Sequence, residues 1–110
     1  MALEGKKPYS FGMDRSSAIA ILKRHKAELE RKGVRHAALF GSTARGDNRP
    51  DSDIDIVVDL GADTSLAVYD YIGLKDYIAS LFDRPVDVVS QEGLKPDVKS
   101  RALRDAIYAF

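Results

Sequence analysis

Residues 53–60 alternate between apolar side chains and a set that is acidic except at Val57, and this stretch constrains the fold more than any other part of the sequence. Successive side chains of a β-strand point to opposite faces, so the alternation predicts a strand with one buried face and one acidic face. The apolar positions are Ile54, Ile56, Val58 and Leu60. On the acidic face Asp53 and Asp55 project together, with α-carbons about 7 Å apart. Two carboxylates this close resist joint ionisation unless a cation lies nearby.

Periodicity elsewhere predicts the elements that cover this strand. We expect helices over residues 14–32, 65–82 and 96–109, and strands over residues 34–40 and 86–89. Gly33 is expected to end the first helix. The expected buried stripes are Leu66, Tyr69, Ile72 or Gly73, Tyr77, Leu81 and Phe82 in the second helix, and Val98, Ala102, Leu103, Ala106 and Ile107 in the last. The fold class is therefore α/β (α+β), a small mixed sheet of three to four strands flanked by helices.

A chain of 110 residues is long enough for one compact domain. Residues 1–13 lack periodicity and are expected to form a flexible arm, which leaves residues 14–110 as a single domain. No apolar run approaches the roughly 20 residues that cross a bilayer, and the N-terminus lacks the apolar core of a signal peptide. The absence of cysteine excludes disulfides, thiolate metal sites and a cysteine nucleophile. We therefore expect a cytoplasmic protein with no membrane partner.

The formal net charge of zero hides an uneven distribution of charge along the chain. Residues 1–50 contain 11 Lys and Arg against 5 Asp and Glu, whereas residues 51–110 contain 6 against 12. A basic half suits phosphate, and an acidic half suits a divalent cation. A solvated surface with a chance asymmetry is the alternative interpretation, so the motifs have to decide.

Asp87 is the third candidate carboxylate, after Asp53 and Asp55. It lies in a short predicted strand whose valines face inward, so its own side chain faces out. If this strand lies beside the strand over residues 53–60, all three carboxylates share one sheet face. Three carboxylates can hold two Mg²⁺ ions roughly 3.5–4 Å apart, together with the phosphates of a nucleotide. An Asp on a short strand can also be a solvated edge residue.

A Gly-Ser turn supplies groups that suit phosphate. Gly41 lets the backbone approach a ligand closely, and Ser42 with the amides after it can donate hydrogen bonds to phosphate oxygens. Arg45 and Arg49 lie close enough in sequence to neutralise some of the charge of a triphosphate. The alternative is an ordinary strand-to-helix turn followed by two surface arginines.

These motifs together resemble a known family. Gly41-Ser42, then ten residues, then Asp53-x-Asp55, and a later strand aspartate at Asp87, look like the nucleotidyltransferase superfamily typified by DNA polymerase beta. The string from Gly41 to Asp55 is similar to that of the minimal members of the superfamily. These are single-domain adenylyltransferase antitoxins of the MntA type, which are encoded beside a HEPN-domain ribonuclease toxin. The similarity covers roughly residues 17–107.

The resemblance implies a function and a role for each residue. Asp53 and Asp55 would bind the Mg²⁺ that carries ATP, Asp87 would activate the acceptor hydroxyl with a second Mg²⁺, and Gly41 and Ser42 would hold the phosphates. The expected activity is transfer of AMP from ATP to a tyrosine of the partner HEPN toxin, which the chain would thereby neutralise as its antitoxin.

Two other functions stay open on the sequence. The chain could inhibit its partner by binding alone, with a nucleotide site that no longer acts, or it could modify a small hydroxylated molecule. Nucleic acid is not an expected partner, because no aromatic residues interleave with the cations of the first predicted helix.

Overall fold

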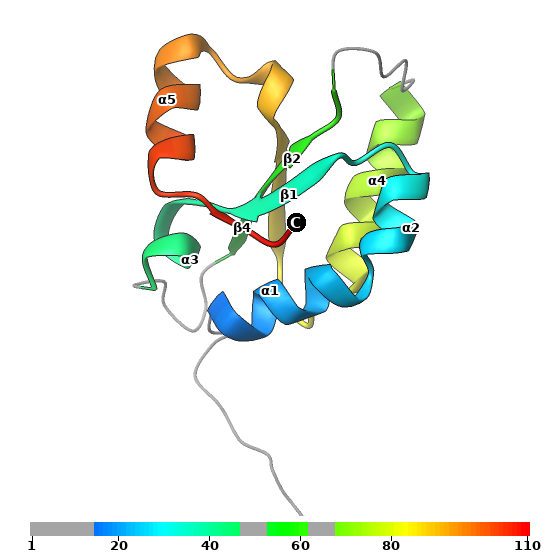
Figure 1. The fold of residues 1–110 in the computed structure, drawn as a ribbon. Helices are drawn as coiled ribbons and strands as arrows, with labels where there is room; N and C mark the ends of the chain where they lie inside the picture. The colour runs from blue at the N-terminus through cyan, green and yellow to red at the C-terminus, as the bar shows by residue number, and fades with distance from the viewer. Residues whose placement is uncertain (1–14, 47–52, 62–67) are drawn as a thin grey trace, which may run out of the picture.

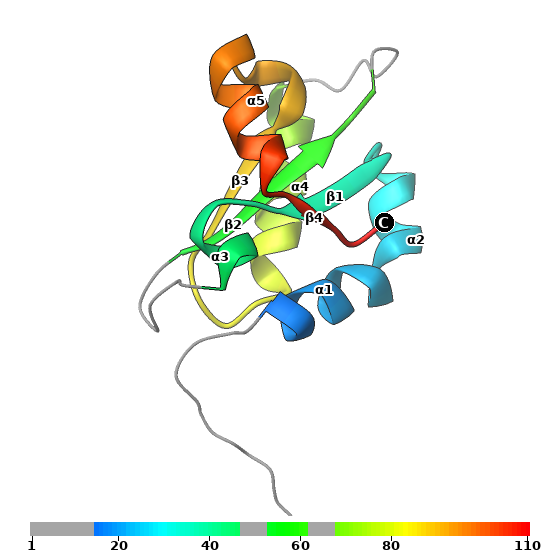
Figure 2. The ribbon, with the colours of Figure 1, turned by 60° about the vertical axis from the view of Figure 1, so that its left-hand side comes forward.

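The computed structural model of the protein describes residues 15–46, 53–61 and 68–110. In these residues four strands form one mixed sheet in the order β3-β2-β1-β4. Helices α1, α2 and α4 lie on one side of the sheet, and α5 lies on the other (Figures 1 and 2). The expected fold class is confirmed. The expected arm over residues 1–13, Arg49 and the first residues of the second predicted helix lie outside the described residues.

The elements follow one another in the order helix, helix, strand, helix, strand, helix, strand, helix, strand. Their bounds are α1 Arg15–Arg24, α2 Lys26–Arg31, β1 His36–Leu39, α3 Gly41–Arg45, β2 Ile54–Asp59, α4 Val68–Ser80, β3 Val86–Ser90, α5 Pro96–Arg104 and β4 Ile107–Tyr108, with a short 3-10 turn at Gln91–Gly93. No helix of the described residues is long and apolar enough to cross a membrane.

Strand β2 lies at the centre of the fold. It pairs antiparallel with β1 and parallel with β3. Ile54, Ile56 and Val58 are fully buried and pack against apolar side chains of α1, α2 and α4. The opposite face carries Asp55, which is half-buried, as the predicted alternation requires. The burial of one face therefore sets which way the carboxylates point.

The first predicted helix divides into α1 and α2 at His25. The backbone N–H of His25 is shared between the carbonyls of Ile21 and Leu22, at 3.3 and 3.2 Å, and the ring Nδ1 also lies 2.9 Å from the Ile21 oxygen. This competition for one carbonyl interrupts the regular ladder of hydrogen bonds. Gly33 follows α2 with φ of 102°, a left-handed conformation that suits glycine, which confirms its predicted position after the helix.

The buried stripe of α4 differs from the prediction. Leu74 and Ile78 of α4 face the core, whereas Ile72 is 53% exposed. Phe82, which follows the helix, is buried as predicted. Tyr77 is only partly buried. Apolar residues occur on several sides of this helix, so periodicity alone does not select the stripe that the sheet covers.

The C-terminal segment also differs from the prediction of one helix over residues 96–109. Helix α5 ends at Arg104, and Ile107 and Tyr108 form β4, which pairs with β1 through Leu39 and Ala38. This strand occupies the backbone groups at the free edge of β1, a contact that no local pattern predicts. None of the residues of α5 is buried, and Val98 is 36% exposed.

The two isoleucines of α4 test this packing. Ile78→Ala removes a fully buried side chain and should lower the free energy of unfolding by about 2–5 kcal/mol. Ile72→Ala, the same change at an exposed position of the same helix, should change it by less than about 0.5 kcal/mol. Urea denaturation followed by circular dichroism measures both. A larger loss at Ile72 than at Ile78 would contradict the described stripe.

Candidate active site

Two of the predicted carboxylates face each other across neighbouring strands. Asp55 of β2 is the register partner of Asp87 of β3 in the parallel pair. Paired strands lie about 4.8 Å apart, and register partners project to the same face, so both side chains lie side by side on the acidic face. Asp87 is exposed. Asp53 precedes the first residue of β2 and is also exposed. The expectation that the strand with Asp87 lies beside the strand with Asp55 is therefore confirmed.

Gly41 lies directly against the carboxylate of Asp55. A β-carbon at this glycine would be 3.0 Å from Oδ2 of Asp55, so close that the carboxylate would have to shift, and φ of Gly41 is +61°. Any other residue here would therefore meet both a strained backbone and a close contact. Glycine lets the start of α3 lie beside the end of β2 that carries the acidic residues (Figure 2).

The backbone of Asp55 is held by two hydrogen bonds where β1 ends. Phe40 N–H donates to the Asp55 carbonyl at 3.1 Å, which extends the β1–β2 ladder by one residue. The Phe40 carbonyl accepts from Ala44 N–H of α3 instead, at 3.3 Å. Asp55 N–H therefore needs another acceptor, and it donates to Oγ1 of Thr43 at 3.0 Å.

Thr43 was not predicted as part of the site. It is fully buried, and among the described residues it is the one buried polar side chain. Its role depends on Asp55, which lies twelve residues further along the chain. A threonine after a Gly-Ser pair carries no local signal of such a partner, so only the tertiary contact reveals it.

Arg15 also supports α3, from the start of α1. Its Nη1 donates to the carbonyl of Ala44 at 2.7 Å, and its guanidinium lies close to Gly46. The carbonyl groups at the end of a helix lack partners within the helix, and an arginine satisfies them well. Ser42 is the second residue of α3, and Arg45 is its last, exposed residue.

The carboxylates suit Mg²⁺ by donor type but do not form a closed cage. In the part of the chain that the structure describes, no three acidic or histidine side chains are close enough to hold a metal ion by themselves. Mg²⁺ is usually held by one or two protein carboxylates and completes its shell with water and substrate phosphates. Asp55 and Asp87, on one face and in register, fit an ion that arrives with phosphates.

Asp59 lies on the same strand but belongs to a different environment. The pKa of Asp59 is lowered from its usual value. Burial alone raises this pKa, but its hydrogen bonds with Glu92 and with Gly61 N–H and the nearby charges of Arg35 and His36 lower it by more. Its Oδ1 accepts from Gly61 N–H at 2.9 Å. Asp59 therefore stabilises the far end of β2 and is not part of the group formed by Asp55 and Asp87.

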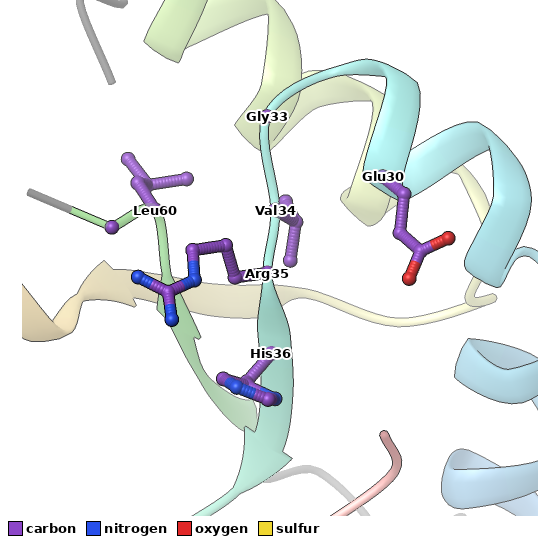
Figure 3. Close-up of a pocket in the computed structure, with 7 residues that line it drawn as sticks. Glu30, Gly33, Val34, Arg35, His36 and Leu60 are labelled. Atoms are coloured by element: carbon purple, nitrogen blue, oxygen red, sulfur yellow. The ribbon is translucent and has the colours of Figure 1, made fainter. Parts of the chain in front are cut away.

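The described residues contain a hollow at each end of the β1–β2 pair. The larger, about 760 Å³, is lined by Glu30, Gly33, Val34, Arg35, His36, Leu60 and Gly61 (Figure 3). Arg35 extends toward Leu60 in this hollow (Figure 3). Glu30 of α2 lies on the opposite side of the segment that carries Val34 and His36 (Figure 3). None of the predicted site residues lines it. The smaller hollow, about 400 Å³, lies between α3 and α5, and Gly41 and Arg45 line it.

Known proteins are similar to this chain in sequence and in fold. A model of the nucleotidyltransferase domain matches residues 22–109. The protein adenylyltransferase MntA of Thermococcus cleftensis is 41% identical over 90 residues, which are 81% of this chain and 89% of the relative. A solved structure assigned as a minimal nucleotidyltransferase is 34% identical, with a TM-score of 0.73, over 86% of this chain and 95% of the other. A toxin-antitoxin structure with AMP-PNP is 26% identical, with a TM-score of 0.64, over 80% and 72%.

The hydrogen bond between Thr43 and Asp55 can be tested by two substitutions. Thr43→Val preserves the shape of the side chain but removes the acceptor of Asp55 N–H, so it should lower the free energy of unfolding by about 1–3 kcal/mol. Thr43→Ser keeps the hydroxyl, removes one methyl group and should lose about 1 kcal/mol. Urea denaturation measures both. Equal stability of the Val variant and the wild type would contradict the role of this bond.

Proposed function

The chain belongs to the nucleotidyltransferase family, and we propose that it transfers AMP from ATP to a hydroxyl group of a partner protein. The relative from Thermococcus cleftensis is named a protein adenylyltransferase, which supports AMP as the group transferred and a protein as the acceptor. The structure with AMP-PNP contains an analogue of ATP, which supports ATP as the donor.

The observation that carries the proposal is the position of Asp55, opposite Asp87 and against Gly41. In this proposal Asp53 and Asp55 would hold a Mg²⁺ ion with ATP, and Asp87 would take part in holding a second ion. When bound, these ions neutralise charge on the reacting phosphate and lower the pKa of the attacking hydroxyl. Gly41 and Ser42 lie along the phosphates, and Arg45 and Arg49 neutralise part of their charge.

At the phosphorus atom the reaction forms one bond and breaks one, and the acceptor hydroxyl loses its proton. The acceptor oxygen forms a bond to the α-phosphorus, and the bond from that phosphorus to the bridging oxygen breaks, with its electron pair leaving on pyrophosphate. The carboxylate of Asp87 accepts the hydroxyl proton and releases it to solvent. Asp55 keeps its position during this step because its backbone is bonded on both sides, to Phe40 and to Thr43.

We propose that the acceptor is a tyrosine of a HEPN-domain ribonuclease toxin, which the modification neutralises, so that the chain acts as its antitoxin in the cytosol. The likeness to a toxin-antitoxin structure supports a toxin as the partner. The exposed position of the acidic face also supports it, because Asp53 and Asp87 are open to a macromolecule. A hydroxyl on a docked protein can reach them without a further domain of this chain.

Asp55→Asn tests the proposed chemistry. The amide lacks the charge that binds Mg²⁺, so AMP transfer should fall by at least about a hundredfold. Asp59→Asn is the matched control, because Asp59 lies on the same face of the same strand at its other end, and transfer should stay within about twofold. The measurement is the intact mass of the protein encoded next to this one, after incubation with this chain, ATP and Mg²⁺. EDTA should abolish the mass increase.

Three outcomes would change the interpretation. Transfer that survives Asp55→Asn would exclude the proposed site. If the partner stays unmodified, and the wild type and Asp55→Asn neutralise it at equal concentration, the chain inhibits its partner by binding alone. Nucleotide found only on a small hydroxylated molecule, with the partner unmodified, would show a different acceptor class.

A further inference from the structure

Three arginines converge on the hollow between α3 and α5. Arg45 comes from the end of α3, and Arg101 and Arg104 come from α5. The hollow is about 400 Å³ in volume, and the other charged side chain among the described residues that line it is Asp105. We call it the arginine pocket, lined by Phe40, Gly41, Arg45, Arg101, Arg104 and Asp105, with Val98 and Ala102 as its apolar wall. Among these described lining residues three are cations and one is a carboxylate, and such a lining suits an anion.

The shape of α5 explains why this hollow exists. Val98, Arg101, Ala102 and Asp105 recur at helical spacing, so they form one stripe of the helix. The sequence predicts that Val98 and Ala102 of this stripe enter the core. They line the arginine pocket instead, and no residue of α5 is buried. The apolar side of α5 thus covers an open space that a ligand can occupy.

Gly41 connects the arginine pocket to the acidic residues. It lines the pocket and also lies against the carboxylate of Asp55. The order of charge across this end of the sheet is therefore carboxylates on β2 and β3, then Gly41, then the guanidinium groups. Resting on the function proposed above, we propose that the arginine pocket binds the phosphates beyond the reacting α-phosphate, with Arg101 and Arg104 of α5 as additional ligands.

The chemistry of the leaving group supports this assignment. When the bond to the α-phosphorus breaks, negative charge develops on the pyrophosphate that leaves. Arginine binds phosphate with two parallel hydrogen bonds and stays charged at any physiological pH. The ion pair of Arg101 with Asp97 is exposed and 3.9 Å long, so it competes weakly with a phosphate. Arg101 and Arg104 would therefore favour both the binding of the triphosphate and the departure of pyrophosphate.

The test uses inorganic tripolyphosphate as the probe, because it contains the phosphate tail without a nucleoside. Titration of the full chain by calorimetry, with Mg²⁺ and separately with EDTA, gives the affinity without any transfer reaction. The double variant with Arg101→Ala and Arg104→Ala should bind at least about tenfold more weakly. Arg24→Ala, an exposed arginine of α1 outside the pocket, is the matched control and should bind like the wild type. Circular dichroism checks that each variant is folded.

Asp105→Asn provides a test of opposite sign. Removing the carboxylate of the arginine pocket should tighten tripolyphosphate binding by about threefold. In transfer assays the double arginine variant should raise KM for ATP, and inhibition by pyrophosphate should weaken in parallel. A purely structural role of these side chains predicts neither the tightening nor the parallel change.

Each alternative has a distinct result. Tripolyphosphate affinity unchanged in the double variant would overturn the proposal. A second probe, the dinucleotide ApA, contains a phosphodiester but no triphosphate. If the double variant loses affinity for ApA alone, the pocket binds the phosphodiester of an already modified acceptor, and the proposal is wrong. Tripolyphosphate binding that depends on these arginines in a protein that transfers no AMP would support the pocket and contradict the proposed function alone.

Discussion

The parallel pairing of β2 with β3 is the contact on which the site depends. Burial of Ile54, Ile56 and Val58 sets which face of β2 is apolar, and the register with β3 then places Asp55 opposite Asp87. A shift of one residue would turn every carboxylate into the core, where an unpaired charge is very costly. The same strand pairing thus buries the hydrophobic face and positions the carboxylates of the acidic face.

The turn between β1 and β2 adds precision to this arrangement. Phe40, Gly41 and Thr43 each use a different property: a backbone donor, the absence of a side chain, and a buried hydroxyl. All three act on Asp55. For the metal-binding role proposed for Asp55, the carboxylate must keep its position without the metal, and rigid backbone contacts achieve this.

Prediction from the sequence succeeds or fails according to the range of the interactions. The alternation over residues 53–60 is a local pattern with one solution, and the central strand follows it. The stripe of α4 is ambiguous, since Ile72 and Ile78 are equally apolar and only the position of the sheet decides between them. The strand at Ile107 and Tyr108 forms because the edge of β1 lies free beside it, which a helical pattern over the same residues cannot reveal.

The sequence by itself determined the chemical groups and their order along the chain: a Gly-Ser turn, an Asp-x-Asp strand and a later strand aspartate. A spacing of two along an extended segment is enough to predict that Asp53 and Asp55 share one face. Only the tertiary structure decided that Asp87 lies beside Asp55, that Thr43 holds it, and that α5 turns its arginines toward Gly41. The physical reason is that these contacts join segments far apart in the chain, and their partners are selected by packing of the whole core and not by local preference.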